Sequence, residues 1–286
     1  MRSMKERRRP ARAAAALVCA ILAVNSISKV ASAANCTAPG CTIAEINAWA
    51  TEVVELIRGA INIDVPEAGN VTYGDPADIL GIASGVPTEA VSLGDAGSVT
   101  VKFADPIYDG PDFDFAVFEN GISSGDPALI FMELGFVEVS SDGINFARFG
   151  ALTSRTTAVA SFEETDPDDY DNLGGNRLAG TGTEFDLFEL SNHPLVISGD
   201  VDLNAILYVR IEDVVGNGSR SDFMGNPIYD PFPTPFITGG FDIDAVGAIN
   251  VPEPGTETGL IAGALGLAWL SRRRERGSVS SQRRPR

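Results

Sequence analysis

The chain has 286 residues, of which 44% are hydrophobic and 21% charged, a composition typical of one large folded domain or two small ones. The formal charge of −18 is unevenly distributed, because residues 34–254 hold 7 basic and 36 acidic side chains and so carry −29. A segment with this negative charge repels a phosphate backbone, which excludes nucleic acid as a partner. With one histidine, His193, and three cysteines, most histidine or thiolate catalysis and a closed zinc site are also excluded.

Residues 1–33 have the pattern of a signal peptide. Six basic side chains precede the apolar stretch Ala13–Val24, and the small residues Ala31-Ser32-Ala33 follow it. The apolar stretch is short for a membrane span, which needs about 20 residues. We therefore expect signal peptidase to cleave after Ala33 and the body to be exported across the inner membrane.

Export changes how the two remaining cysteines are interpreted. Outside the cytoplasm thiols oxidise, and Cys36 and Cys41 flank a short loop with Pro-Gly at its turn. The sequence predicts a disulfide between them that fixes the new N-terminus. A free pair with a redox role is the alternative, although the spacing is not that of a Cys-x-x-Cys motif.

Residues 34–65 are expected to hold this loop and one amphipathic helix. Apolar residues recur at spacings of three and four between Thr42 and Ile63, with Thr42 placed as the N-cap and Glu45 three residues later. A stripe of this kind packs on a core, so Trp49 is interpreted as structural.

Residues 66–250 change to short alternating runs separated by Gly, Asp, Asn and Pro, which predicts an all-β sandwich or barrel. The expected strands are Ser98–Phe103, Phe113–Phe118, Phe131–Val139, Ile144–Phe149, Ile206–Val214 and Phe241–Ile249.

Four strings in this region carry a resemblance. Phe136–Phe146 resembles the central hairpin of galactose-binding-like, discoidin-type jelly rolls, and Gly240–Val246 resembles the last strand of jelly-roll carbohydrate-binding modules. With Phe115–Gly121 and Gly225–Pro231, they also resemble a group of bacterial surface proteins. The resemblance implies a jelly-roll type β-sandwich, a fold that hosts many functions.

The C-terminal region, 251–276, resembles the PEP-CTERM sorting signal of exported bacterial proteins. The motif Val251, Pro252, Glu253 and Pro254 precedes an apolar segment, 255–271, and an arginine cluster, Arg272–Arg276. As a helix the apolar segment spans about 25 Å, slightly short of a hydrocarbon layer of roughly 30 Å. The resemblance implies transient anchoring and cleavage by an exosortase-type membrane transpeptidase, followed by a basic tail, 277–286. An ordinary single-pass anchor is the alternative.

Acidic residues gather at the ends of the predicted strands. Carboxylates that converge with carbonyl oxygens form the shell of six to eight oxygens that calcium requires. The sequence therefore suggests calcium as a cofactor, with Asp222, Asp230, Asp242 and Asp244 as ligands. Asp244 is singled out by the resemblance to carbohydrate-binding modules. The alternative is that these loops only keep an exported protein soluble.

Carboxylate pairs are the only catalytic device that the composition leaves, and Glu119, Glu133 and Glu138 lie in or beside strands. Glu138 alternates with two valines and is expected to face solvent. Sugar binding usually needs exposed rings, and Tyr229, Phe232 and Phe236 lie in the proline-rich loop 227–236, where they either present aromatic faces or plug the end of the sandwich.

From these features we expect a non-enzymatic exported protein of the cell surface or extracellular matrix. The first alternative is a calcium-dependent module that binds extracellular polysaccharide. The second is a carboxylate-dependent glycan hydrolase.

Overall fold

The computed structural model describes residues 36, 39–126 and 128–252. The chain divides into two units, and the first, 1–32, lies outside the described residues, as do the expected signal peptide and the segment 255–271. Among the described residues no helix has the length and apolar character to cross a membrane.

The described part of the second unit is all-β, as predicted. One antiparallel sheet, here the β6/β14 sheet, contains β1 (Cys41–Thr42), β12 (Thr181–Phe185), β6 (Phe115–Glu119), β14 (Asp242–Ala248), β2 (Ala48–Trp49) and β4 (Val91–Ser92). The other, here the β7/β13 sheet, contains β11 (Leu173–Gly174), β7 (Gly135–Ser140), β13 (Ile206–Asp213), β5 (Ser98–Ile107), β3 (Glu52–Ile57) and β8 (Ala147–Arg148). A small separate sheet pairs β9 (Leu152–Thr153) with β10 (Tyr170–Asp171).

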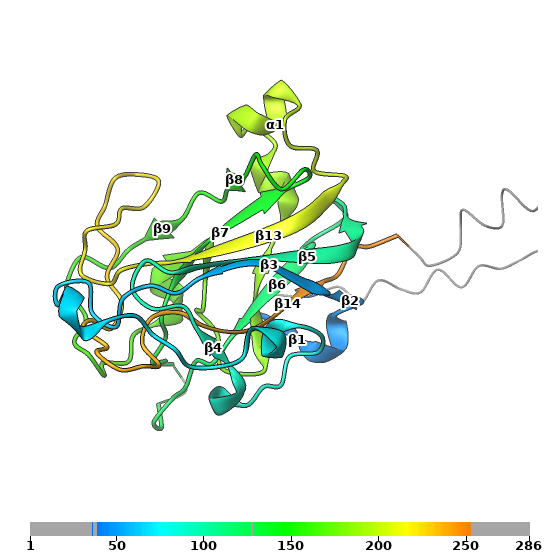
Figure 1. The fold of residues 1–286 in the computed structure, drawn as a ribbon. Coiled ribbons are helices and arrows are strands. Elements are labelled where there is room, and N and C mark those ends of the chain that lie inside the picture. The colour runs from blue at the N-terminus through cyan, green and yellow to red at the C-terminus, as the bar shows by residue number, and fades with distance from the viewer. Residues whose placement is uncertain (1–35, 37–38, 127, 253–286) are drawn as a thin grey trace, which may run out of the picture. The chain divides into compact units, whose positions relative to one another are not determined.

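Helical structure is sparse in the described residues. The single α-helix, α1 (Pro194–Ser198), follows β12 and precedes β13 in the chain, and it projects from the sheets (Figure 1). The Nδ1 atom of His193, its N-cap residue, accepts a hydrogen bond from the Leu195 N–H. Single 3₁₀ turns occupy Ile43–Glu45, Pro66–Ala68, Pro76–Ile79, Pro87–Glu89, Pro167–Asp169 and Leu187–Leu190.

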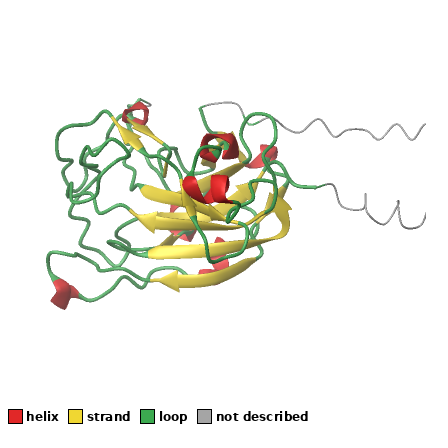
Figure 2. Ribbon diagram, turned by 90° about the horizontal axis from the view of Figure 1, so that it is seen from above, coloured by secondary structure: helices red, strands yellow, loops and turns green. Residues whose placement is uncertain are grey.

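The main core lies between the two sheets, because side chains alternate between the two faces of each strand and the apolar ones point toward the other sheet. Val137 and Val139 of β7 point inward, as do Val117 and Val246 of the β6/β14 sheet. Three phenylalanine rings extend this core, and the centroids of Phe115 and Phe185 are 5.2 Å apart in a stacked arrangement. The strands pack in layers, while long loops gather at one end (Figure 2).

The predicted helix over Thr42–Ile63 is wrong. This segment contains β1, the turn Ile43–Glu45, β2 and the edge strand β3, which pairs with β5. The register of β3 shifts between Val53 and Glu55, so Val53 and Leu56 both pack on the core although they are three residues apart. A bulge thus places apolar residues of a strand at a helix-like spacing.

Two local predictions in the same segment hold. Thr42 and Glu45 form the predicted capping box, but it caps a single 3₁₀ turn, and the Thr42 N–H donates to Glu45 Oε2 at 2.7 Å. The disulfide between Cys36 and Cys41 is present, with a Cα–Cα distance of 5.0 Å. Both cysteines are buried against the outer side of the β6/β14 sheet, near Trp49 and Phe118, so the bridge covers a second, smaller core.

Candidate functional site

The predicted calcium ligands have separate local roles. Asp244 is 3% exposed, and its Oδ1 and Oδ2 accept hydrogen bonds from the N–H groups of Ser84 and Gly85, each at 2.9 Å. It therefore anchors the loop before β4 to strand β14. Both of its oxygens already bind N–H donors, so an ion would have to share them.

Asp222 closes its own loop. It accepts hydrogen bonds from the N–H groups of Thr153, Met224 and Asn226 and from Asn226 Nδ2. Burial opposes ionisation of Asp222, but these donors, Asn226 foremost, lower its pKa below the usual value.

Asp230 lies in a tightly packed part of the structure. Its Oδ2 accepts a hydrogen bond from Leu134 N–H at 2.9 Å, and a Cβ added at Gly216 would meet its Oδ1 at 1.7 Å. Burial, then the nearby Asp213 carboxylate, raise its pKa well above the usual value.

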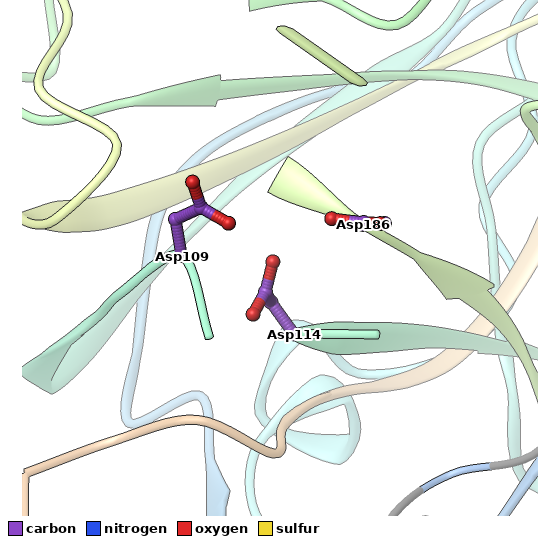
Figure 3. A group of neighbouring side chains, drawn as sticks. All are labelled: Asp109, Asp114 and Asp186. Atoms are coloured by element: carbon purple, nitrogen blue, oxygen red, sulfur yellow. The ribbon is translucent and has the colours of Figure 1, made fainter. Parts of the chain in front are cut away.

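A different trio has the closest carboxylates. Among the described residues, Asp109, Asp114 and Asp186 are the one set of three whose ligand oxygens all lie within 4.8 Å of one another. They come from the ends of β5, β6 and β12, and Figure 3 shows their carboxylates directed toward a common space. Predicted ligands Asp222, Asp230, Asp242 and Asp244 form no such set in the described part of the chain.

The Asp114 carboxylate is already well supplied with donors. Its Oδ1 accepts from Gly110 N–H and Asn250 Nδ2, and its Oδ2 accepts from Leu187 N–H at 2.7 Å. Burial, with a smaller contribution from Asp186, raises the pKa of Asp114 to about 6. The trio fits calcium only in part, because Asp114 and Asp186 already accept hydrogen bonds and three carboxylates supply fewer than the six to eight free oxygens required.

A pocket of about 640 Å³ lies at the loop-rich end. Phe131 lies in the β6–β7 connection, Phe162 in the loop before β10, and Phe236 in the proline-rich loop before β14. The ring centroids of Phe131 and Phe162 are 6.4 Å apart, and those of Phe162 and Phe236 are 5.8 Å apart. Phe162 is 71% exposed and Phe236 46% exposed, so rings that remain accessible form one wall.

Polar side chains line the rest of the pocket, and three of them, Asn120, Glu133 and Asp242, come from residues at or beside strand ends. Asn120 donates through Nδ2 to Asp242 Oδ2 at 2.8 Å, while Glu133 Oε1 accepts from Gly240 N–H at 2.9 Å. Asp242 is 6% exposed, and its Oδ1 has no hydrogen-bond partner among the described residues. Acceptors therefore lie beside exposed aromatic rings, an arrangement typical of small-molecule sites.

A third carboxylate, Glu119, lies close to Glu133 and Asp242. Glu119, at the end of β6, is buried, and neither of its carboxylate oxygens has a hydrogen-bond partner among the described residues. Burial, then the Asp242 charge, raise the pKa of Glu119 well above its usual value. Burial also raises the pKa of Glu133 well above its usual value, with Asp242 as the next cause, and the pKa of Asp242 to about 6. Glu119, Glu133 and Asp242 thus repel one another in a poorly hydrated region.

The sequence foresaw this site only in part. The sequence indicates Asp242, Glu133 and Glu119 as single residues, and it indicates the proline-rich loop as an aromatic platform or a plug. In the structure Phe236 is exposed at the pocket, whereas Tyr229 and Phe232 are half-buried. Phe131, Phe162 and Asn120 were not foreseen.

Of the sorting motif, Val251 is half-buried and Pro252 is exposed, directly after the last strand, while Glu253 and Pro254 lie outside the described residues. No protein-family model matches the chain, and no curated protein matches it.

Proposed function

We propose that the protein is a non-enzymatic, exported cell-surface or extracellular-matrix protein whose β-sandwich binds extracellular polysaccharide in the phenylalanine-lined pocket. The pocket carries the binding part of this proposal. Sugars present apolar C–H faces that pack on rings such as Phe162 and Phe236, and hydroxyl groups that donate to acceptors such as Asp242. The terminal signals in the sequence support the surface location.

Binding is tested by affinity electrophoresis or calorimetry with a panel of soluble polysaccharides. Phe162→Ala removes an exposed ring and should weaken binding about tenfold, since burying a phenylalanine side chain contributes about 1.5–3 kcal/mol. Phe188→Ala is the matched control, because Phe188 is 65% exposed and does not line the pocket. Equal binding by both variants and the wild type, or no binding to any polysaccharide, contradicts the proposal.

Export and sorting form the second part of the proposal. Signal peptidase removes residues 1–33, the segment 255–271 anchors the chain transiently, and an exosortase-type transpeptidase cuts near Pro252–Pro254. An epitope inserted in an exposed loop, followed by fractionation and mass measurement, tests this route. The expected product lacks both terminal segments and appears at the cell surface or in the medium, whereas retention in the cytoplasmic fraction contradicts it.

We also propose that the β-sandwich is of the jelly-roll type and that it binds calcium. The antiparallel pairing of strands that are distant in sequence, such as β6 with β14 and β5 with β13, supports a jelly-roll type of sandwich. Calcium is the ion that the trio of Asp109, Asp114 and Asp186 would take, through the free oxygens of Asp109 and Asp186. There it would join the ends of three strands and stabilise the fold.

A glycan hydrolase is the second candidate, because two carboxyl groups with raised pKa values, Glu133 and Asp242, face a pocket that takes sugar in this proposal. Release of reducing ends by the wild type, lost in Glu133→Gln, would establish hydrolysis. We expect binding without release.

A further inference from the structure

Buried polar atoms in the pocket wall and in residues beside it lack hydrogen-bond partners among the described residues. Asp242 Oδ1, both carboxylate oxygens of Glu119 and Ser92 Oγ have no hydrogen-bond partner among the described residues. Ser92 lies opposite Asp242 in the pairing of β4 with β14, and Asp242 lines the pocket. Buried acceptors are normally paired, and the side-chain donors beside Asp242 are Asn120 and the Ser92 hydroxyl, so the buried carboxylate oxygens outnumber the side-chain donors.

The described residues bring one cation, Arg58, close to this region. Six of the seven basic side chains between residues 34 and 254 form ion pairs with other carboxylates, and the seventh, Arg58, has no ion pair among the described residues. Arg58 lies near Asp242, but its guanidinium donates to the carbonyl oxygens of Tyr73, Ser92 and Gly74. Arg58 offsets part of the Asp242 charge, but no ion pair in the described residues involves Glu119 or Glu133, so three carboxyl groups outnumber the one cation beside them.

The shape of the site distinguishes an organic cation from a bare metal ion. A volume of about 640 Å³ holds a sugar ring, and the faces of Phe162 and Phe236 attract positive charge through their π systems. A metal would need several converging oxygens, and in the described residues the pocket carboxylates contain no set of three within 4.8 Å of one another.

From these observations we infer that the pocket selects a polysaccharide unit with a free, positively charged amine, as in an amino sugar that lacks its N-acetyl group. The ammonium donates to Asp242 and Glu133, while the sugar ring packs against Phe162. This inference rests on the proposed polysaccharide binding. The charge of −29 on residues 34–254 favours cationic over anionic polymers.

Two ligands that differ only at the nitrogen test the inference. The full secreted chain is titrated with an oligomer of glucosamine and with the same oligomer after N-acetylation, at physiological salt and below the pKa of the sugar amine. We expect the free amine to bind roughly 10- to 100-fold more tightly, which is the range for a hydrogen bond between charged groups.

Asp242→Asn tests whether that preference arises in the pocket. It keeps an acceptor for Asn120 and removes the charge, so the preference for the free amine should fall at least about tenfold while binding of the acetylated oligomer changes little. Asp105→Asn is the matched control, because it changes the net charge equally at an exposed residue outside the pocket. Melting curves of both variants establish that they are folded.

The outcomes separate the two proposals. Equal affinity of the wild type for both oligomers overturns the amine preference and leaves polysaccharide binding in place. An amine preference that Asp242→Asn retains, or that Asp105→Asn reduces equally, assigns it to the net charge and also overturns the inference. Failure to bind either oligomer or any other polysaccharide overturns the proposed function itself. Tighter binding of a lysine-rich peptide than of the amine oligomer overturns the assignment to a sugar.

Discussion

Carboxylates on the outer face of the β7/β13 sheet form ion pairs, whereas Glu119, Glu133 and Asp242, in and beside the pocket, form none among the described residues. On the outer face, here the arginine face, Glu138 pairs with Arg148 at 2.7 Å and with Arg210, and Glu212 pairs with Arg148 and Arg220. In the pocket region, Glu119, Glu133 and Asp242 have no ion-pair partner among the described residues.

Aromatic rings are used differently in the two regions as well. On the arginine face, the guanidinium carbons of Arg148 and Arg220 lie 4.5 Å and 5.2 Å from the Phe136 centroid, and that of Arg210 lies 4.0 Å from the Phe146 centroid. In the pocket, Phe162 and Phe236 are exposed and have no such cation in the described residues. The arginine face contains a charge complement that the pocket carboxylates have only in part, and this contrast supports the proposal that the pocket takes an external cation.

The largest expected effect is on the pH dependence of stability. The folded-state pKa values of Asp213, Asp242 and Glu133 are raised, to about 7, to about 6 and well above the usual value, in each case mainly by burial. Between about pH 4 and these values the folded state binds more protons than the unfolded chain, so the free energy of unfolding falls as pH rises. In chelator and without ligand, we expect it to fall by several kcal/mol between about pH 5 and pH 8.

Denaturant titrations across this range measure the slope. Carboxylates with lowered pKa values, such as Asp222, lose their stabilising contribution below about pH 4 and do not mask the effect. Glu133→Gln should leave stability near pH 5 unchanged and raise it near pH 8. A free energy of unfolding that rises with pH between pH 5 and pH 8 would show that the pocket carboxylates are compensated after all.

Matched substitutions in the two regions should have opposite signs. Glu138→Gln removes the charge that holds Arg148 and Arg210, and we expect a loss of about 2 kcal/mol, since the arginines remain about one-third exposed. Glu133→Gln at neutral pH should be neutral or stabilising, because it removes a buried carboxyl group whose ionisation burial opposes and whose ionised form has no ion-pair partner among the described residues. Thermal and denaturant unfolding of both variants measures the difference, and losses of equal size would break the contrast.

Residues of the arginine face also show what the sequence can predict. The alternation of Val137, Glu138 and Val139 places Glu138 opposite to the core, as the structure has it, but Glu138 is 5% exposed because arginines cover it. The expectation that it faces solvent was therefore wrong. A period of two fixes the side of a strand on which a residue lies, but it does not reveal which side chains of neighbouring strands cover it.

The strands can be predicted more easily than the site, because a strand has a local pattern in the sequence whereas the site depends on contacts between distant segments. Runs such as Ile206–Asp213 and Asp242–Ala248 carry their own signal, while the bulge in β3 mimicked a helical spacing. Phe131, Phe162 and Phe236 meet only because three loops converge at one end of the sandwich. No local pattern in the sequence encodes that convergence.

Asp244→Asn distinguishes a loop anchor from the calcium ligand that the resemblance implied. Both carboxylate oxygens of Asp244 accept hydrogen bonds from backbone N–H groups. In the asparagine variant one of these N–H groups faces the side-chain NH₂ and loses its acceptor. We expect a loss of about 1–2 kcal/mol, the cost of a buried unsatisfied donor. If Asp244 acts only as an anchor, melting curves will show the same loss in chelator and in calcium, whereas a loss seen in calcium alone would make it a ligand.

The smallest expected effect concerns calcium itself, and it extends the contrast between paired and unpaired carboxylates to the trio of Asp109, Asp114 and Asp186. An ion that binds only the folded state adds RT ln(1 + [L]/Kd) to stability, about 1.4 kcal/mol at a tenfold excess over Kd. For a domain of this size, we expect the melting temperature to rise by a few degrees. Asp186→Asn should abolish the rise, because it removes a carboxylate that keeps a free oxygen, whereas Asp105→Asn should retain it. Sodium at matched ionic strength is the control for screening, which would act equally on all variants. A rise that sodium reproduces, or identical curves in chelator and calcium, would show that the strand ends carry these carboxylates without a bound ion.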